Sequence, residues 1–140
     1  MEFNKILVPV TGTKVDEEAM RLACRLTKTK KEKSIIWSVY VVTIKRSLPL
    51  DAELASEIHK AEEVLGHIEM IAGEEDKEIE TDILQAREAG PAIIDEAVER
   101  GVDVILMGAS YKKRFGQFSL GDVAPYVLKN SVCPVILYHQ

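Results

Sequence analysis

The residue types best suited to binding a ligand are concentrated in residues 107–122, with the sequence MGASYKKRFGQFSLGD. Gly108 and Gly121 lie near its two ends, and the basic residues Lys112–Arg114 lie between them. Glycine lets backbone N–H groups approach a phosphate closely, and basic side chains neutralise its charge. The segment therefore fits a phosphate-binding loop, and it also fits an exposed basic loop.

Apolar runs of strand length alternate with helical periodicity along the chain. The sequence predicts strands over residues 5–10, 34–42, 77–86, 102–108 and 133–139, and helices over about 15–26, 50–73, 90–101 and 123–130. This order predicts an α/β domain with a parallel sheet and helices on both faces. Ligands of such sheets bind beyond the carboxyl ends of the strands, where residues 11–14 and 108–122 follow the first and fourth strands.

The composition is that of one globular domain spanning residues 1–140. The chain has 46% hydrophobic and 29% charged residues, with a formal net charge of -5. A negative balance opposes non-specific nucleic-acid binding, because polyanion binders carry a basic excess. We expect the basic cluster at residues 27–33 to be a solvated connection between a helix and a strand.

The termini and the cysteines indicate the compartment. Residues 1–10 do not resemble a signal peptide, and no stretch reaches membrane-spanning length. Cys24 and Cys133 are far apart, and neither has a partner at metal-ligand spacing, which favours a reducing compartment. We therefore expect a cytoplasmic protein with no membrane partner.

Four segments together resemble the universal stress protein family, and the resemblance covers nearly the whole chain. These segments are KILVPV followed by a small polar turn, YVV, VDVILMG and NSVCPVILY. Nucleotide-binding members carry Gly-x-x-Gly, nine residues and then Gly-Ser or Gly-Thr, and Gly108 and Gly121 hold the outer positions. The resemblance implies a doubly wound, Rossmann-like five-stranded sheet of order 3-2-1-4-5, and ATP or AMP as the ligand, with Mg²⁺ only as the companion of a nucleotide.

Three positions depart from the family pattern. Tyr111 stands where the second glycine would lie, Asp122 where the hydroxyl residue would lie, and Thr11 where an Asp typically follows the first strand. Tyr111 removes backbone freedom, and an ionised Asp122 can only accept hydrogen bonds. Asp122 is also expected to cap the helix over 123–130, using the N–H groups that a phosphate would need. Pro125 fits the first turn of that helix.

The resemblance also implies where a nucleotide would lie. Pro9, Val10 and Thr11 would edge the base and ribose, Val41 would face the adenine, and Met107 and Gly108 would lie below the ribose. The phosphate side would use the loop and the start of the last helix. The complete candidate set is Pro9, Val10, Thr11, Val41, Met107, Gly108, Ser110, Lys112, Arg114, Gly121, Asp122 and Val123.

The last strand predicts self-association. Residues Val135, Ile136, Leu137 and Tyr138 are too apolar for an exposed sheet edge. Pairing across a two-fold axis would cover them, and the resemblance also implies dimers through this strand. The alternative is that the chain's own termini cover the edge.

The sequence is compatible with three functions. The first is a dimeric stress-response module with weakened or lost ATP binding that acts through an unknown protein partner. The second is an adenine-nucleotide-binding member in which Lys112, Lys113 and Arg114 offset Asp122. The third is a flavodoxin-like electron carrier, because VTGTK faintly resembles that family's phosphate loop.

We expect no enzyme and no metal site. No nucleophile and base can be assembled, so slow ATP hydrolysis would rest on family analogy alone. His59, Glu63 and His67 recur at four-residue spacing, and eight residues between the histidines favour a solvent-facing stripe over a zinc site.

Overall fold

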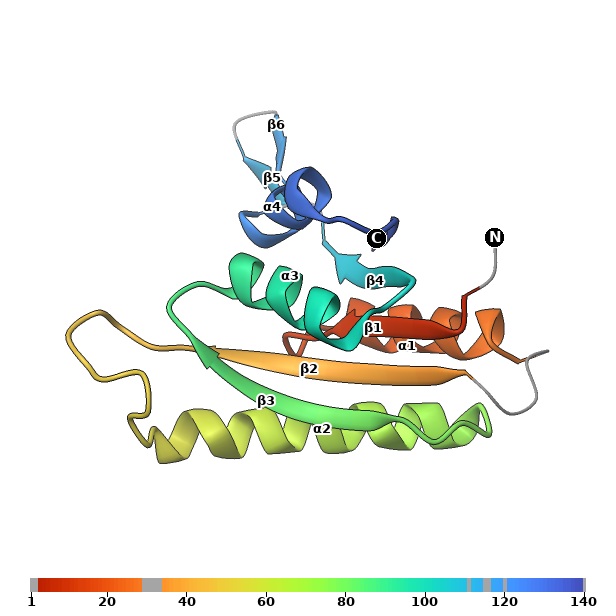
Figure 1. Cartoon of the computed structure of the whole chain (residues 1–140), viewed down its shortest axis with the longest axis horizontal. Coiled ribbons are helices and arrows are strands. Elements are labelled where there is room, and N and C mark those ends of the chain that lie inside the picture. The colour runs from red at the N-terminus through yellow and green to blue at the C-terminus, as the bar shows by residue number, and fades with distance from the viewer. Residues whose placement is uncertain (1–2, 29–33, 111, 115–116, 120, 140) are drawn as a thin grey trace.

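A computed structural model describes residues 3–28, 34–110, 112–114, 117–119 and 121–139. Tyr111 and residues 29–33 of the basic cluster lie outside the described residues. The main sheet has five parallel strands in the order β3-β2-β1-β4-β7, which confirms the expected fold (Figure 1). The elements are β1 Lys5–Pro9, α1 Lys14–Leu26, β2 Ile35–Thr43, α2 Ala55–Glu74, β3 Glu80–Ala86, α3 Ala89–Arg100, β4 Val104–Ala109, β5 Lys112–Arg114, β6 Gln117–Ser119, α4 Val123–Asn130 and β7 Val135–His139.

Successive side chains of the buried strands enter two different cores. On β1, Ile6 and Val8 pack in the core under α1 and α2, whereas Leu7 packs in the core under α3 and α4. On β4, Leu106 and Met107 divide in the same way. Alternation sends neighbouring residues of a strand to opposite faces, so both faces of the sheet need apolar residues. This explains the continuous apolar runs in the sequence.

The helix α2 begins at Ala55, five residues later than its periodicity predicts. The side-chain amide of Gln85 on β3 donates to the carbonyl oxygens of Leu50 and Ala52, at 2.7 and 3.1 Å. These bonds hold residues 50–52 outside the helix. The helix α3 behaves as predicted, because Gly101 follows it with φ 61, a conformation that favours glycine.

The segment between β4 and α4, which we expected to be a loop, contains two short paired strands. Its residues form the short antiparallel strands β5 and β6, in which Lys112 pairs with Ser119 and Arg114 with Gln117. The ribbon projects beside α4, away from the main sheet (Figure 1). Pairing within the ribbon satisfies backbone polar groups that a projecting loop would leave to water.

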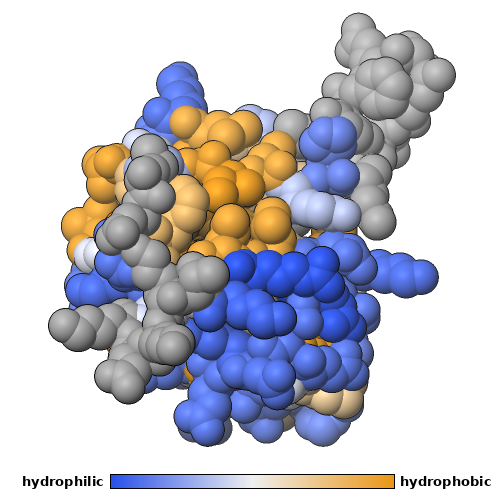
Figure 2. Space-filling model, turned by 90° about the vertical axis from the view of Figure 1, so that its right-hand side faces the viewer, coloured by the Kyte–Doolittle hydropathy of each residue, from blue (hydrophilic) through white to orange (hydrophobic). Residues whose placement is uncertain are grey.

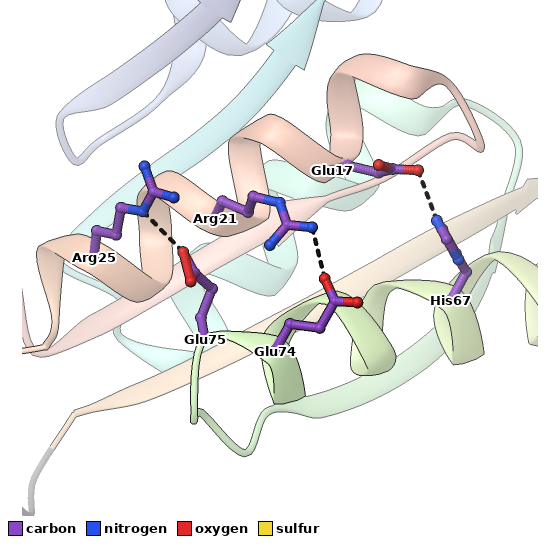
Figure 3. A network of polar contacts seen from close by, with 6 residues as sticks. All are labelled: Glu17, Arg21, Arg25, His67, Glu74 and Glu75. Carbon is purple, nitrogen blue, oxygen red and sulfur yellow. Dashed lines mark hydrogen bonds and ion pairs between the residues drawn. The ribbon is translucent and has the colours of Figure 1, made fainter.

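Ion pairs join α1 to α2 along their exposed sides (Figure 3). Arg21 contacts Glu74 at 2.7 Å, and Arg25 contacts Glu75 at 2.8 Å. At the amino end of α1, His67 Nε2 lies 2.7 Å from Glu17 Oε1. The three contacts link α1 to α2 from the first turn of α1 to its last turn.

The expected stripe on α2 is only partly solvent-facing. His59 and Glu63 are 74% and 69% exposed and pair at 2.8 Å, whereas His67 turns toward α1. Within the described ranges, no group of three or more His, Cys, Asp or Glu residues is arranged to hold a metal ion. The described helices include none with the length and apolar character needed to cross a membrane.

Candidate functional site

A cavity of about 290 Å³ opens at the carboxyl ends of β1, β2 and β4. The chain reaches it from the turn after β1, from the end of β4 and from the start of α4. The described lining includes ten of the predicted site residues, namely Pro9, Val10, Thr11, Val41, Met107, Gly108, Ser110, Gly121, Asp122 and Val123. Their proximity is observed, whereas their role in binding stays a prediction.

Most of the cavity wall is apolar. Val39 and Val41 contribute from β2, Ile93 from α3 and Met107 from β4. Val39, Ile93 and Met107 are buried members of the core under α3 and α4, so their positions are fixed by packing. The wall is therefore suited to the face of a flat, largely apolar group such as a heterocyclic base.

Asp16 is a charged cavity residue that the sequence analysis missed. One carboxylate oxygen, Oδ2, accepts the backbone N–H groups of Thr11, Gly12 and Thr13 at 3.0, 2.7 and 3.0 Å. Asp16 is the third residue of α1 and is only 3% exposed. A Thr followed three residues later by an acidic residue, before an apolar helical pattern, is a capping-box signature and could have identified it.

Opposing effects act on the Asp16 carboxyl. Burial raises its pKa above the ordinary value of 3.8, while the N–H groups of Gly12, Thr11 and Thr13 act to lower it. Burial disfavours the charged form, and hydrogen bonds to that form favour it. The three donors nevertheless give a buried anion in the cavity wall a fixed set of partners.

Asp122 occupies the expected N-cap position of α4. The prediction that its carboxylate caps the helix is wrong. Its backbone has φ -99 and ψ -30, in the helical region, and its side chain makes no cap hydrogen bond. An N-cap side chain reaches the first-turn N–H groups from an extended backbone, which Thr13 of α1 has and Asp122 lacks. Asp122 is exposed at the cavity and leaves the helix start uncapped by its own carboxylate.

Gly108 and Gly121 each have a structural reason that is independent of a ligand. A Cβ at Gly108 would lie 2.9 Å from Val15 Cγ1 and 3.0 Å from the Val15 carbonyl oxygen, so glycine lets α1 approach β4. Gly121 has φ 78, in the left-handed region. The presence of these two glycines is therefore no evidence of phosphate binding.

The charge of the described wall is negative. Asp16 and Asp122 line the cavity, and its described lining residues include no Lys, Arg or His. For Lys112 and Arg114 the structure describes the backbone in β5, and the direction of their side chains lies outside what is described. Whether they reach the cavity remains a prediction.

Comparisons with known proteins agree with this architecture. The model of the universal stress protein family matches residues 2–139. Universal stress protein MJ0531 of Methanocaldococcus jannaschii is 32% identical over 141 residues, covering 96% of this chain and 81% of that protein. A universal stress protein structure from Archaeoglobus fulgidus has a TM-score of 0.78 at 24% identity, covering 96% of this chain and 98% of the other. A structure from the same organism in complex with dAMP has a TM-score of 0.74 at 24% identity, covering 98% of each chain.

Proposed function

Because the chain belongs to the universal stress protein family, we propose that it is a dimeric regulatory module that binds ATP weakly and acts through protein contacts. The observation that carries this proposal is the pair of carboxylates, Asp16 and Asp122, in a cavity wall whose described residues contribute no cation. Family membership favours this function over an electron carrier. We assign no residue to a chemical step.

Electrostatic repulsion is the reason for weak ATP binding. Two like unit charges about 6 Å apart repel by on the order of 3 kcal/mol at the effective dielectric of a protein surface. Such a cost lowers an association constant by about a hundredfold. Asp122 is exposed, so water and salt screen it more than the buried Asp16.

The second candidate is an adenine-nucleotide sensor. The apolar wall at Val41 and Met107 suits an adenine base, and a relative of similar fold has been solved with dAMP. In this candidate Lys112 and Arg114 reach the phosphates and offset the two carboxylates. The two functions differ in the ATP affinity that they predict.

Calorimetric titration with ATP and Mg²⁺ tests the nucleotide part. We expect wild type to bind no more tightly than about 1 mM, and Asp122→Ser to bind up to about tenfold more tightly. Asp51→Ser removes the same charge from an exposed connection before α2 and is the matched control. Wild-type binding well below millimolar would reject the weak-binding proposal in favour of the sensor.

The dimer part rests on the exposed edge of the main sheet. Strand β7 is the last strand on one side, and its apolar residues Val135, Ile136, Leu137 and Tyr138 are each only partly buried. On the face displayed in Figure 2, apolar residues gather beside a hydrophilic area. A second copy that pairs with this edge would cover unpaired backbone groups and apolar side chains together.

Light scattering after size exclusion tests the assembly. We expect wild type to be a dimer and Val135→Lys to be a monomer with an unchanged circular dichroism spectrum, because edge lysines oppose strand pairing. Val98→Lys is the control, since Val98 is 57% exposed on α3. A monomeric wild type, or a dimer that survives Val135→Lys, would contradict pairing through β7.

A further inference from the structure

The cavity has a shape and lining that suit a small uncharged ligand. Its volume is about 290 Å³, at the lower end of ligand pockets. Val41 and Met107 offer apolar surface to a flat ring, and Thr11 and Ser110 place hydroxyl groups at the exposed rim. Hydroxyl groups both donate and accept hydrogen bonds, which matches the hydroxyl groups of a sugar.

The backbone donors nearest the strand ends are already used. The N–H groups of Thr11, Gly12 and Thr13 converge on Asp16 Oδ2, so this turn resembles an anion-binding nest filled by the chain's own carboxylate. A phosphate group could use these donors only by displacing a buried carboxylate tied to the same helix. The three N–H groups are therefore already hydrogen-bonded to Asp16 and are not free for a phosphate.

The start of α4 favours an anion through its dipole and through the N–H groups of Val123 and Ala124, so opposition to a phosphate there comes from Asp122. Pro125 is the third residue of that helix and has no N–H group, and the N–H of Tyr126 points to the Asp122 carbonyl oxygen at 3.4 Å. The exposed Asp122 carboxylate adds negative charge at the same place. Both borders of the cavity thus carry a carboxylate, whose charge opposes that of a phosphate.

We propose that the cavity binds an uncharged purine nucleoside in preference to its phosphorylated forms, and that Asp16 is the specificity-determining residue. This inference rests on the proposed function, because it takes the same cavity as the binding site. The apolar wall receives the base, the rim hydroxyl groups face the sugar, and the Asp16 carboxylate excludes phosphate from the turn after β1.

Calorimetric titration with adenosine and with AMP, under one set of salt and pH conditions, tests the inference. We expect wild type to bind adenosine at least about tenfold more tightly than AMP. We expect Asp16→Asn to raise AMP affinity by about tenfold and to change adenosine affinity by less than about twofold, because only the charge is removed.

Glu17→Gln is the matched control. It removes a carboxylate from the next position of α1, where Glu17 faces His67 on α2 (Figure 3). Glu17 is absent from the cavity lining, so AMP affinity should stay at the wild-type value. Thermal unfolding of each variant establishes that it is folded at the titration temperature.

The possible outcomes separate the inference from the function on which it rests. Wild type that binds ATP weakly and adenosine no more tightly than ATP overturns the inference and leaves the proposed weak ATP binding intact. Tight ATP binding overturns both. If wild type binds AMP as tightly as adenosine, the ligand class is wrong. Unchanged AMP affinity in folded Asp16→Asn, or an equal gain in Glu17→Gln, overturns the role of Asp16. If Asp16→Asn does not fold, the comparison of adenosine with AMP in wild type still tests the ligand class.

Discussion

The two loops that border the cavity each contain an aspartate, but the two carboxylates differ in their surroundings. Asp16, in the first turn of α1, is buried and accepts three backbone N–H groups. Asp122, before α4, is exposed and makes no capping hydrogen bond. The Asp16 carboxylate therefore contributes to the stability of the fold, whereas the Asp122 carboxylate chiefly affects the electrostatic potential in the cavity. Removing Asp16 should lower stability more than removing Asp122.

The close contact between Gly108 on β4 and Val15 on α1 should give the largest change in stability when it is disturbed. Gly108→Ala places a Cβ against both the side chain and the backbone of Val15, and overpacking of this kind costs about 1–3 kcal/mol. Urea unfolding measures the loss. The control is Gly66→Ala on the exposed side of α2, where no atom lies within 4 Å of the new Cβ. That variant should gain about 0.5–1 kcal/mol, and an equal loss in both would contradict the steric account.

The next effect separates the two aspartates by stability. Asp16→Ala leaves three N–H groups without their acceptor and should lower the free energy of unfolding by about 1–2 kcal/mol. Asp122→Ala should change it by less than about 0.5 kcal/mol, because no capping bond is lost. Chemical denaturation of both variants decides the matter. Equal losses would mean that Asp122 is structural as well.

The elements of the fold could be predicted because their signals are local. Gly101 ends α3, Pro125 fits the first turn of α4, and the buried strands are continuous apolar runs. The start of α2 could not be predicted, since it depends on hydrogen bonds from Gln85 on β3. The residue that sets the start of α2 therefore lies on another element, far along the chain.

The sequence predicted the apolar part of the candidate site better than its charged part. The parallel topology places Pro9, Val41 and Met107 at one end of the sheet, so alternation and strand order suffice to gather them. Asp16 had a local signal in Thr13, which the sequence analysis did not use. The helical backbone of Asp122 has no comparable signal in the sequence around it.

The smallest expected effect concerns the titration of Asp16. Its pKa is raised by burial, so the folded state binds more protons than the unfolded state at pH values just above 3.8. The stability of wild type should therefore fall, relative to Asp16→Asn, as the pH rises from 3.8 to the folded-state pKa. Urea unfolding of both proteins between about pH 3 and 6 measures this difference. A relative gain with rising pH would mean that the three N–H bonds outweigh burial.

If both borders of the cavity repel an anion, this repulsion should be visible in the affinities of wild type for adenosine, AMP, ADP and ATP. Measured by calorimetry in one buffer, the affinity should fall at the first phosphate and should not recover at the second or third. A steady rise in affinity from adenosine to ATP would contradict this repulsion, because it would require cations that outweigh Asp16 and Asp122.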